Sequence, residues 1–229
     1  MKNCMVTLID KLYMNKLMSH LFHTSIFCLQ RELKDCQSVL DLGCGPGSPL
    51  QYCKNIKYSV GVEVFQPYLE ESKKKKIHTK YLNKKIEELD FSENSFHAVV
   101  MIGVLEHLPQ KVGLEILRNV EKWAEKKVIV SSPNGFISQK ELDNNPYQRH
   151  LSGWDYKKMK KMGFRIKGFA SLKFLRQEVQ QDTMRHDLMT SIKYHPKIFW
   201  FAIASLTQIV TYYIPQLAFE LFSVKKVSK

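Results

Sequence analysis

A glycine-rich turn that directly follows a short apolar segment places the strongest constraint on the fold of this chain. Residues Val39 to Leu42 (VLDL) form the apolar segment, and the sequence GCGPG occupies residues 43–47. A segment of this length suffices for a buried strand, and glycines allow the positive φ angles of a sharp turn. The pattern therefore predicts a strand that ends in a tight, glycine-lined turn.

Short apolar segments alternate with segments of helical periodicity along the rest of the chain. We expect further strands at Tyr58 to Val64, Phe96 to Ile102, Lys127 to Ser131, Phe164 to Ala170 and Leu217 to Val224. Helices are expected at Pro67 to Lys76, Pro109 to Trp123 and Tyr156 to Met162. Because such alternation is typical of parallel βαβ units, the sequence predicts a doubly wound α/β domain.

The two ends of the chain differ from this central pattern. Apolar residues recur at helical spacing between about residues 5 and 34, which predicts N-terminal helices. Ile198 to Ile214 contains no charged residue and predicts an apolar helix before the last strand. We therefore divide the chain into an N-terminal helical cap (1–35), a core (36–175), and an apolar helical insertion with the closing strand (176–229).

An acidic residue lies at the end of the second predicted strand. Glu63 is placed where, in nucleoside-binding α/β sheets, a carboxylate accepts hydrogen bonds from ribose hydroxyls. The loop reads G-x-G-x-G, not the G-x-G-x-x-G of dinucleotide-binding domains. The sequence thus favours a nucleoside cofactor, and a Tyr156/Lys160 pair keeps a dehydrogenase open as an alternative.

Several of these segments resemble the class I S-adenosylmethionine-dependent methyltransferases. VLDLGCGPG (residues 39–47) is similar to the first motif of that family, and VGVEV (60–64) is similar to its second strand. SFHAVV (95–100) and VLEHL (104–108) resemble its fourth strand and the loop that follows. The resemblance spans about residues 36–170 and is closest to the small-molecule branch that includes ubiquinone-type enzymes.

The resemblance implies a Rossmann-like, seven-stranded, mostly parallel sheet with an antiparallel last strand, and S-adenosylmethionine as the cofactor. The implied cofactor-binding residues are Asp41, Gly43, Gly45, Gly47, Glu63, Ile86 and Glu87. Among them, Asp41 would order the glycine loop, Glu63 would hold the ribose, and Ile86 would contact the adenine. The sequence departs from the family at Lys85, where an acid is frequent, and at His97, which replaces the Asp of an S-F-D triplet.

Two histidines are candidates for catalysis. His107 follows the fourth strand and His150 lies in the segment after the fifth strand, so both should reach the pocket mouth. An imidazole can act as a general base for a hydroxyl acceptor. The alternative for His107 is that it only caps the next helix.

The segment NPYQRHLSGW (residues 145–154) concentrates polar and aromatic side chains in one predicted loop. We expect Tyr147, His150 and Trp154 to bind the acceptor, because this loop should overhang the carboxyl edge of the sheet. The alternative for Trp154 is packing into the core.

Charge suggests an anionic partner. The chain has 35 Lys and Arg against 22 Asp and Glu, a net charge of +13. The apolar segment 198–214 beside a basic run favours an anionic membrane surface, with a homodimer contact, a pocket for a lipid-like acceptor or simple packing as alternatives. Nucleic acid is less favoured, since no RNA-binding motif is present.

The sequence predicts no metal site and no signal peptide. The five cysteines match no zinc spacing and are typical of reduced thiols in a cytoplasmic protein. We expect a cytoplasmic enzyme, peripheral at the membrane, that methylates a small or lipid-like acceptor at oxygen. The alternatives are an RNA or protein methyltransferase, and a membrane-associated protein that binds the cofactor without turnover.

Overall fold

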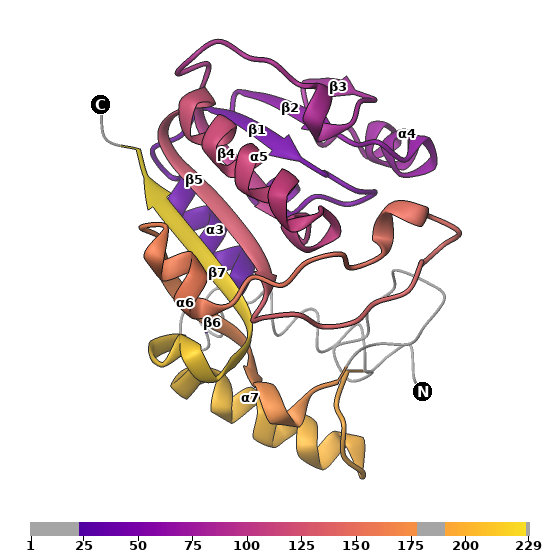
Figure 1. The fold of residues 1–229 in the computed structure, drawn as a ribbon, viewed down its shortest axis with the longest axis vertical. Coiled ribbons are helices and arrows are strands. Elements are labelled where there is room, and N and C mark those ends of the chain that lie inside the picture. Colours follow the sequence, from indigo (N-terminus) through magenta and orange to yellow (C-terminus); the bar gives the residue numbers. More distant parts are fainter. Residues whose placement is uncertain (1–22, 178–190, 228–229) are drawn as a thin grey trace.

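The computed structural model describes residues 23–177 and 191–227, and these residues form an α/β domain built on one seven-stranded sheet (Figure 1). The strands are β1 (Ser38–Leu42), β2 (Tyr58–Val62), β3 (Lys80–Leu82), β4 (Phe96–Ile102), β5 (Ala124–Pro133), β6 (Arg165–Leu172) and β7 (Ala218–Lys226). Their order is β3-β2-β1-β4-β5-β7-β6, and only β7 runs antiparallel to its neighbours. The predicted doubly wound sheet with an antiparallel last strand is confirmed.

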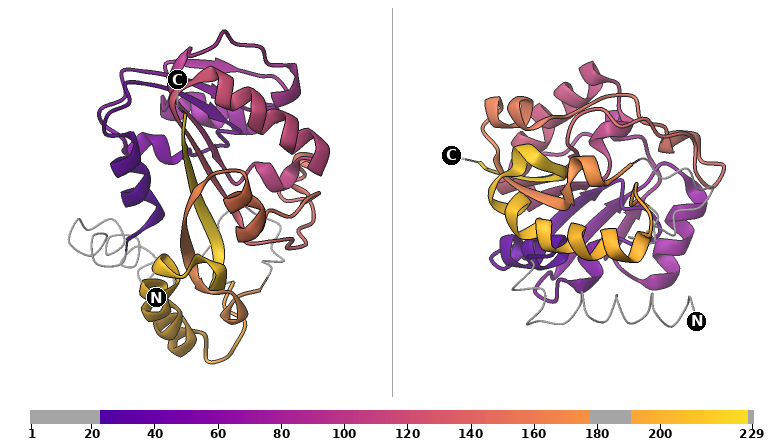
Figure 2. Two further views of the ribbon diagram at one scale, coloured as in Figure 1. Left: turned by 60° about the vertical axis from the view of Figure 1, so that its left-hand side comes forward. Right: turned by 90° about the horizontal axis from the view of Figure 1, so that it is seen from below.

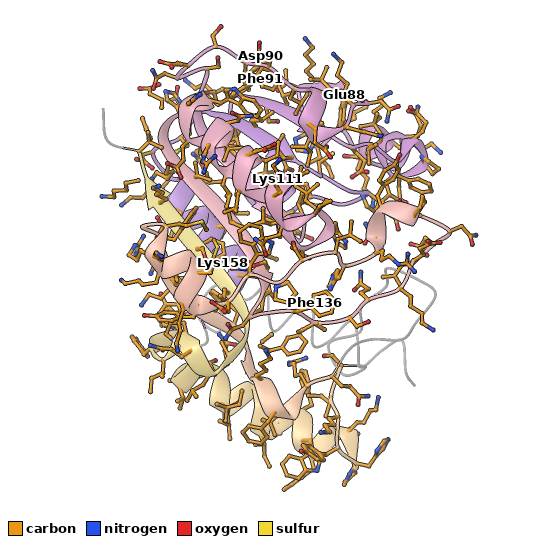
Figure 3. The ribbon with its side chains drawn as sticks, viewed as in Figure 1. Glu88, Asp90, Phe91, Lys111, Phe136 and Lys158 are labelled. Carbon is orange, nitrogen blue, oxygen red and sulfur yellow. The ribbon has the colours of Figure 1, made fainter. Side chains whose placement is uncertain are left out.

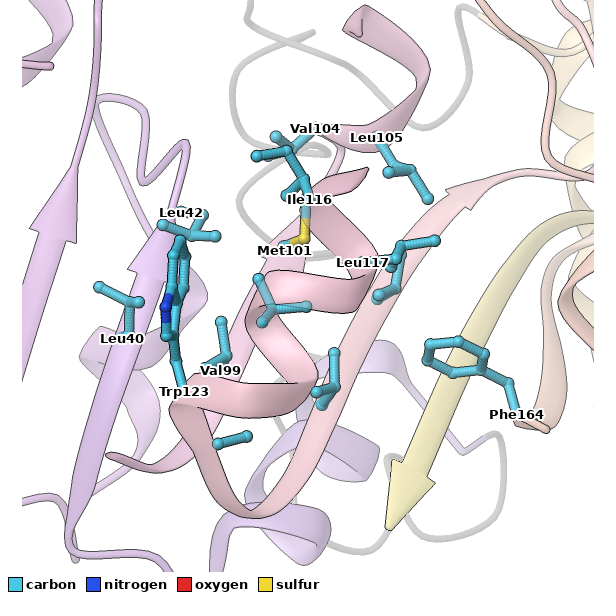
Figure 4. Packing of buried hydrophobic residues seen from close by; sticks show 14 of the residues in the cluster. Leu40, Leu42, Val99, Met101, Val104, Leu105, Ile116, Leu117, Trp123 and Phe164 are labelled. Atoms are coloured by element: carbon cyan, nitrogen blue, oxygen red, sulfur yellow. The ribbon is translucent and has the colours of Figure 1, made fainter. Parts of the chain in front are cut away.

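Helices cover both faces of this sheet (Figure 2). They are α3 (Ser25–Leu33), α4 (Gln66–Lys75), α5 (Gln110–Trp123), α6 (Tyr156–Lys161) and α7 (Lys197–Tyr213). Because side chains alternate along a strand, Leu40 and Leu42 face one side with α5 and α6, while Val39 faces the other side with α3. Figure 4 shows the first of these clusters, in which Ile116, Leu117 and Trp123 of α5 pack on the sheet.

The expected N-terminal cap lies only partly within the described residues. Its residues 1–22 fall outside them. The part that is described, α3, begins at the cap residue Thr24, whose Oγ1 accepts the N–H of Phe27. Leu29 and Leu33 are buried against the sheet, so α3 is a core helix.

Helix α7 follows β6 and precedes β7 in the sequence, and it packs on β6 through a face of small and polar residues. Ala204, Gln208 and Thr211 are buried, whereas Leu206 is 63% exposed. Gln208 donates its amide to the carbonyl oxygen of Gly168 (3.2 Å). A Cβ on Gly168 would lie 2.2 Å from the carbonyl oxygen of Thr211, so only glycine permits this close approach.

The outward face of α7 is therefore apolar. Its exposed large side chains are Ile198, Phe199, Leu206, Ile209, Val210 and Tyr213. The helix lies at the same end of the sheet as the carboxyl ends of the parallel strands (Figures 1 and 2). Within the described residues, no helix combines the length and apolar character that a membrane crossing requires.

Candidate active site

The loops at the carboxyl ends of β1, β2, β4 and β5 enclose one cavity of about 1450 Å³. Parallel strands end at the same edge of the sheet, so segments far apart in sequence meet there. The glycine loop and the residues after β3 form one half of the lining, which we call the cofactor half. The turn after β4 and the β5–α6 loop (residues 134–155) form the other, which we call the acceptor half.

The glycine loop adopts the backbone conformations that its sequence predicts. Gly43 and Gly45 have φ angles of +66° and +55°, which side-chain-bearing residues rarely adopt. A Cβ on Gly43 would also lie 2.5 Å from Cγ2 of Val104. Gly47 has an ordinary φ and lies near Lys75. All three glycines line the cavity.

Glu63 ties the glycine loop to the end of β2. Its carboxylate accepts the N–H of Gly45 (3.1 Å) through one oxygen and the N–H of Phe65 (2.8 Å) through the other. Burial raises the pKa of Glu63, and these backbone donors oppose that rise. A carboxylate has about four acceptor positions, so Glu63 keeps acceptor capacity for a ligand in the cavity.

Asp41 lies beneath the same loop. Its Oδ2 accepts the hydroxyl of Ser48 (2.5 Å), and Ser48 in turn caps the following 3₁₀ turn (Pro49–Tyr52). Nε2 of His78 lies 3.4 Å from this oxygen without the alignment of a hydrogen bond. Burial raises the pKa of Asp41 to about 7 and lowers the pKa of His78 to about 4. The hydrogen bond from Ser48 links Asp41 to the glycine loop that it was predicted to order.

The remaining predicted cofactor residues also reach the cavity. Ile86 and Glu87 lie in a 3₁₀ turn (Ile86–Glu88) after β3, and both line the cofactor half together with Lys85.

The structure explains why a histidine can stand at position 97, where the family has an aspartate. Nδ1 of His97 accepts the N–H groups of Gln37 (3.0 Å) and Ser38 (3.2 Å), so the imidazole supplies the acceptor that links β4 to the start of β1.

His107 and His150 come together in the acceptor half. Their ring centroids are 4.8 Å apart. Nδ1 of His107 lies 3.2 Å from the carbonyl oxygen of Arg149, and Nδ1 of His150 lies 2.6 Å from that of Ile137. A carbonyl oxygen can only accept, so both Nδ1 atoms carry the proton and both Nε2 atoms have a free lone pair.

The electrostatics of this pair follow from burial. Burial lowers the pKa of His107 to about 4 and also lowers that of His150. Glu106, next to His107, is 5% exposed, and burial raises its pKa to about 8. The sequence analysis singled out both histidines but not Glu106, which the structure places in the cavity wall.

The β5–α6 loop is attached to the domain near both ends. Near its start, the amide of Asn134 donates to the carbonyl oxygens of Pro215, Gln216 and Ala218. Near its end, the N–H groups of Leu151 and Ser152 both donate to the carbonyl oxygen of Glu106 (2.8 and 3.1 Å). The stretch between these anchors lines the acceptor half of the cavity.

Of the three residues predicted to bind the acceptor, two line the cavity and one does not. Tyr147 and His150 line it, and Tyr147 is 44% exposed. Trp154 was predicted wrongly: it is fully buried, and its indole N–H donates to the carbonyl oxygen of Leu105 (3.0 Å) and to Ser152. A Cβ on Gly113 would lie 2.5 Å from its ring, so Trp154 fills the space beneath α5 and is a core residue.

Two further features of the cavity wall have no motif in the sequence. Glu220 of β7 lines the cavity and accepts the hydroxyl of Ser131. Tyr68 of α4 donates to the carboxylate of Asp143 (2.7 Å), and this bond joins the β5–α6 loop to the cofactor half. Both contacts link segments about 75 to 90 residues apart, so local patterns could not reveal them.

Comparison with known proteins agrees with this geometry. Residues 39–127 match the family model of a methyltransferase domain. Over 116 residues the chain is 35% identical to the uncharacterized protein MJ1252 of Methanocaldococcus jannaschii, a match that covers 49% of this chain. The match covers 43% of MJ1252, so the chain spans less than half the length of this curated relative.

Two solved structures share the fold. A SAM-dependent methyltransferase from Archaeoglobus fulgidus superimposes with a TM-score of 0.52 at 18% identity, covering 92% of this chain and 98% of that protein. The methyltransferase domain of bacterial CtHen1-C gives a TM-score of 0.52 at 18% identity, with coverage of 89% and 97%. The family model spans the glycine loop and Glu63, and the chain has the seven-stranded fold of the class I S-adenosylmethionine-dependent methyltransferases.

Proposed function

We propose that this chain transfers a methyl group from S-adenosylmethionine to a small or lipid-like acceptor, at an oxygen atom. The observation that carries the proposal is the single cavity whose two halves carry different chemistry. Its volume of about 1450 Å³ exceeds the roughly 300–1,000 Å³ of a typical single-ligand pocket. A cofactor and an acceptor can therefore lie side by side in it.

The cofactor half has the groups that a sulfonium nucleoside needs. Glu63 offers free acceptor positions to the ribose diol, and Ile86 gives an apolar surface to the adenine. Asp41 holds the glycine loop in place from below, so that the backbone of Gly43 and Gly45 can approach the methionine part closely. When bound, the cofactor supplies the methyl group for an in-line displacement, in which alignment contributes most of the acceleration.

The acceptor half supports an oxygen nucleophile. His107 and His150 present free Nε2 lone pairs beside Tyr147, so they can accept the proton of an acceptor hydroxyl group. Loss of that proton is required when a hydroxyl is methylated. A hydroxyl-bearing acceptor therefore fits this half better than one that reacts as a neutral amine.

The lipid-like character of the acceptor is proposed from the surface beside the cavity. The apolar face of α7 points outward, and Phe136 (59% exposed, Figure 3) and Phe174 (61% exposed) are further exposed aromatic side chains. Six residues after Tyr213 the chain reaches Phe219, which lines the cavity. We propose that this face lies in the interface of an anionic membrane, peripherally, while the net charge of +13 attracts it there.

The test measures S-adenosylhomocysteine release by the purified chain with three acceptor pools: a cell lipid extract, total RNA, and denatured protein. Release with lipid alone supports the proposal. Release with RNA or protein alone would move the enzyme to those acceptors, which the positive charge also suits. Cofactor binding without release from any pool would make the chain a binding protein.

Membrane association is tested separately by flotation with anionic and neutral vesicles. The variant Leu206→Ser/Ile209→Ser removes apolar area from the outward face of α7, and Tyr58→Ser removes a 42% exposed aromatic ring at the start of β2 as the control. We expect the α7 variant to lose binding to anionic vesicles and the control to keep it. Equal flotation of all three proteins would contradict a role of α7.

A further inference from the structure

We propose that Glu106, His107 and His150 bind a divalent transition-metal ion in the acceptor half of the cavity. The three side chains come from two separate segments, the turn after β4 and the β5–α6 loop. One ligand atom of each lies within 4.8 Å of the other two. Side-chain rotations that move these atoms by roughly 1 Å would bring them to the roughly 3–3.4 Å spacing that metal bonds of about 2.1 Å require.

The orientation of the two imidazoles fits metal ligation. Each ring donates from Nδ1 to a backbone carbonyl, that of Arg149 for His107 and that of Ile137 for His150. Histidine ligands commonly donate their other ring N–H in this way, which fixes the ring and directs the free nitrogen to the metal. Here both Nε2 atoms are left without the proton.

Glu106 supplies the independent observation. It is 5% exposed, and its Oε2 is buried without any hydrogen-bond partner. A buried carboxyl oxygen without a hydrogen-bond partner is energetically unfavourable, so such groups normally have a role. A cation between Glu106 and the two imidazoles would satisfy this oxygen. Glu220, which lines the same cavity, adds a second carboxylate nearby.

The ligand set indicates the class of metal. Two imidazoles and one carboxylate suit Zn²⁺, Mn²⁺, Fe²⁺ or Co²⁺, whereas Mg²⁺ and Ca²⁺ prefer oxygen ligands alone. Three protein ligands leave coordination positions open, as in metal sites that bind substrate. These positions face the cavity, where an acceptor oxygen would be bound and made more acidic. This role in methyl transfer rests on the proposed function; the metal binding itself does not. With a metal bound, the Nε2 lone pairs of the two histidines would be used in ligation, so the acidified acceptor hydroxyl would lose its proton to solvent and not to the imidazoles.

The experiment titrates the metal-free purified chain with Co²⁺, in the absence of cofactor and acceptor, and follows visible ligand-field absorption and the heat of binding. We expect one ion per chain. His107→Gln and His150→Gln should each weaken binding at least about tenfold, and the double variant should abolish the absorption bands. Glu106→Gln should weaken binding to a similar extent.

Two matched controls keep the test specific. His97→Asp replaces a histidine outside the cavity by a residue that can accept the same two N–H groups, and Glu71→Gln changes another carboxylate of the cavity wall that pairs with Lys75. Both should bind Co²⁺ like the unmodified chain. If Glu106→Gln fails to fold, the half-buried histidine pair still decides the question.

No Co²⁺ binding by the unmodified chain, or equal binding by the double histidine variant, overturns the proposal. The outcome is separate from that of the proposed function. If the chain binds Co²⁺ at these residues but releases no S-adenosylhomocysteine, the metal site is supported and the proposed function is contradicted. If the chain methylates an acceptor after complete metal removal, the proposed function is supported and the metal has no role in the reaction.

Discussion

The two halves of the cavity are built in different ways. The cofactor half is built mainly from backbone: glycines at positive φ, N–H groups held by Glu63, and a loop fixed by Asp41 through Ser48. The acceptor half is built from side chains that converge from β4, the β5–α6 loop and β7. Backbone conformation depends on neighbouring residues, whereas convergence depends on the whole fold. Substitutions in the cofactor half should therefore destabilise the chain, whereas side chains of the acceptor half should be replaceable with little loss of stability.

The largest effect is expected where the backbone constraint is strictest. Gly43→Ala places a Cβ 2.5 Å from Val104 at a φ of +66°, and we expect roughly 2–5 kcal/mol of lost stability. Gly45→Ala has the positive φ but open space around it, so its cost should be about 1–2 kcal/mol. Gly47→Ala is the control and should stay within about 0.5 kcal/mol. Urea unfolding measures the stability loss of each variant, and equal losses in all three would contradict the backbone constraint at Gly43.

The next effect is a pH dependence caused by Asp41. The folded chain holds its pKa near 7 against an ordinary 3.8. The stability that neutral Asp41 contributes is therefore full below about pH 4 and is lost as the pH rises through 7. Asp41→Asn cannot ionise, so its stability relative to the unmodified chain should rise by roughly 2–4 kcal/mol between pH 4 and pH 8.

This comparison is made by urea unfolding of the cofactor-free chain at several pH values. The groups near Asp41 are Ser48, His78 and Glu63. Asp90→Asn, at an exposed carboxyl (labelled in Figure 3), is the control, because an exposed group loses little hydration on folding. A stability difference for Asp41→Asn that does not change with pH would contradict the assignment.

A smaller effect is expected from Glu63→Gln. An amide cannot accept from both Gly45 and Phe65, and it would present N–H groups to one of them. S-adenosylhomocysteine binding should weaken about 10- to 100-fold, or roughly 1.4–2.8 kcal/mol, as calorimetry can measure. Glu71→Gln, an exposed carboxylate of the same cavity, should change the affinity by no more than about twofold. Equal losses in both variants would remove the specific role of Glu63.

The smallest effect should come from the outward face of α7. Leu206 is 63% exposed, so Leu206→Ser should change stability by less than about 0.5 kcal/mol in thermal unfolding. Gly168→Ala, beneath the same helix, should destabilise by more than about 1 kcal/mol because of its contact with Thr211. A large loss in Leu206→Ser would mean that this face is covered by another surface in solution.

Sequence alone predicted most of the fold and much of the cofactor half. The longer strands were placed to within about three residues, because each is a buried apolar run with a turn residue after it. The strand β3 (Lys80–Leu82) was missed, since three residues at an edge carry no recognisable period. An apolar helix was predicted at residues 198–214, but not that the helix would pack through Gln208 and Thr211, which requires Gly168 opposite.

The acceptor half was predicted only in part, for a physical reason. His107, His150 and Tyr147 were found from the residue types of loops that follow strands. The burial of Trp154 and the meeting of Glu106 with His150 depend on contacts more than 40 residues apart in sequence. No local pattern records such contacts, and only the folded sheet brings them together.

The double attachment of the β5–α6 loop has an evolutionary consequence. Asn134 fixes its start to the segment after α7, and Leu151 and Ser152 fix its end to the backbone of Glu106. The span between them can gain, lose or exchange residues while the strands and the glycine loop stay where they are. Descendants of this chain could therefore acquire new acceptors by recombination within one surface segment, with cofactor use inherited unchanged.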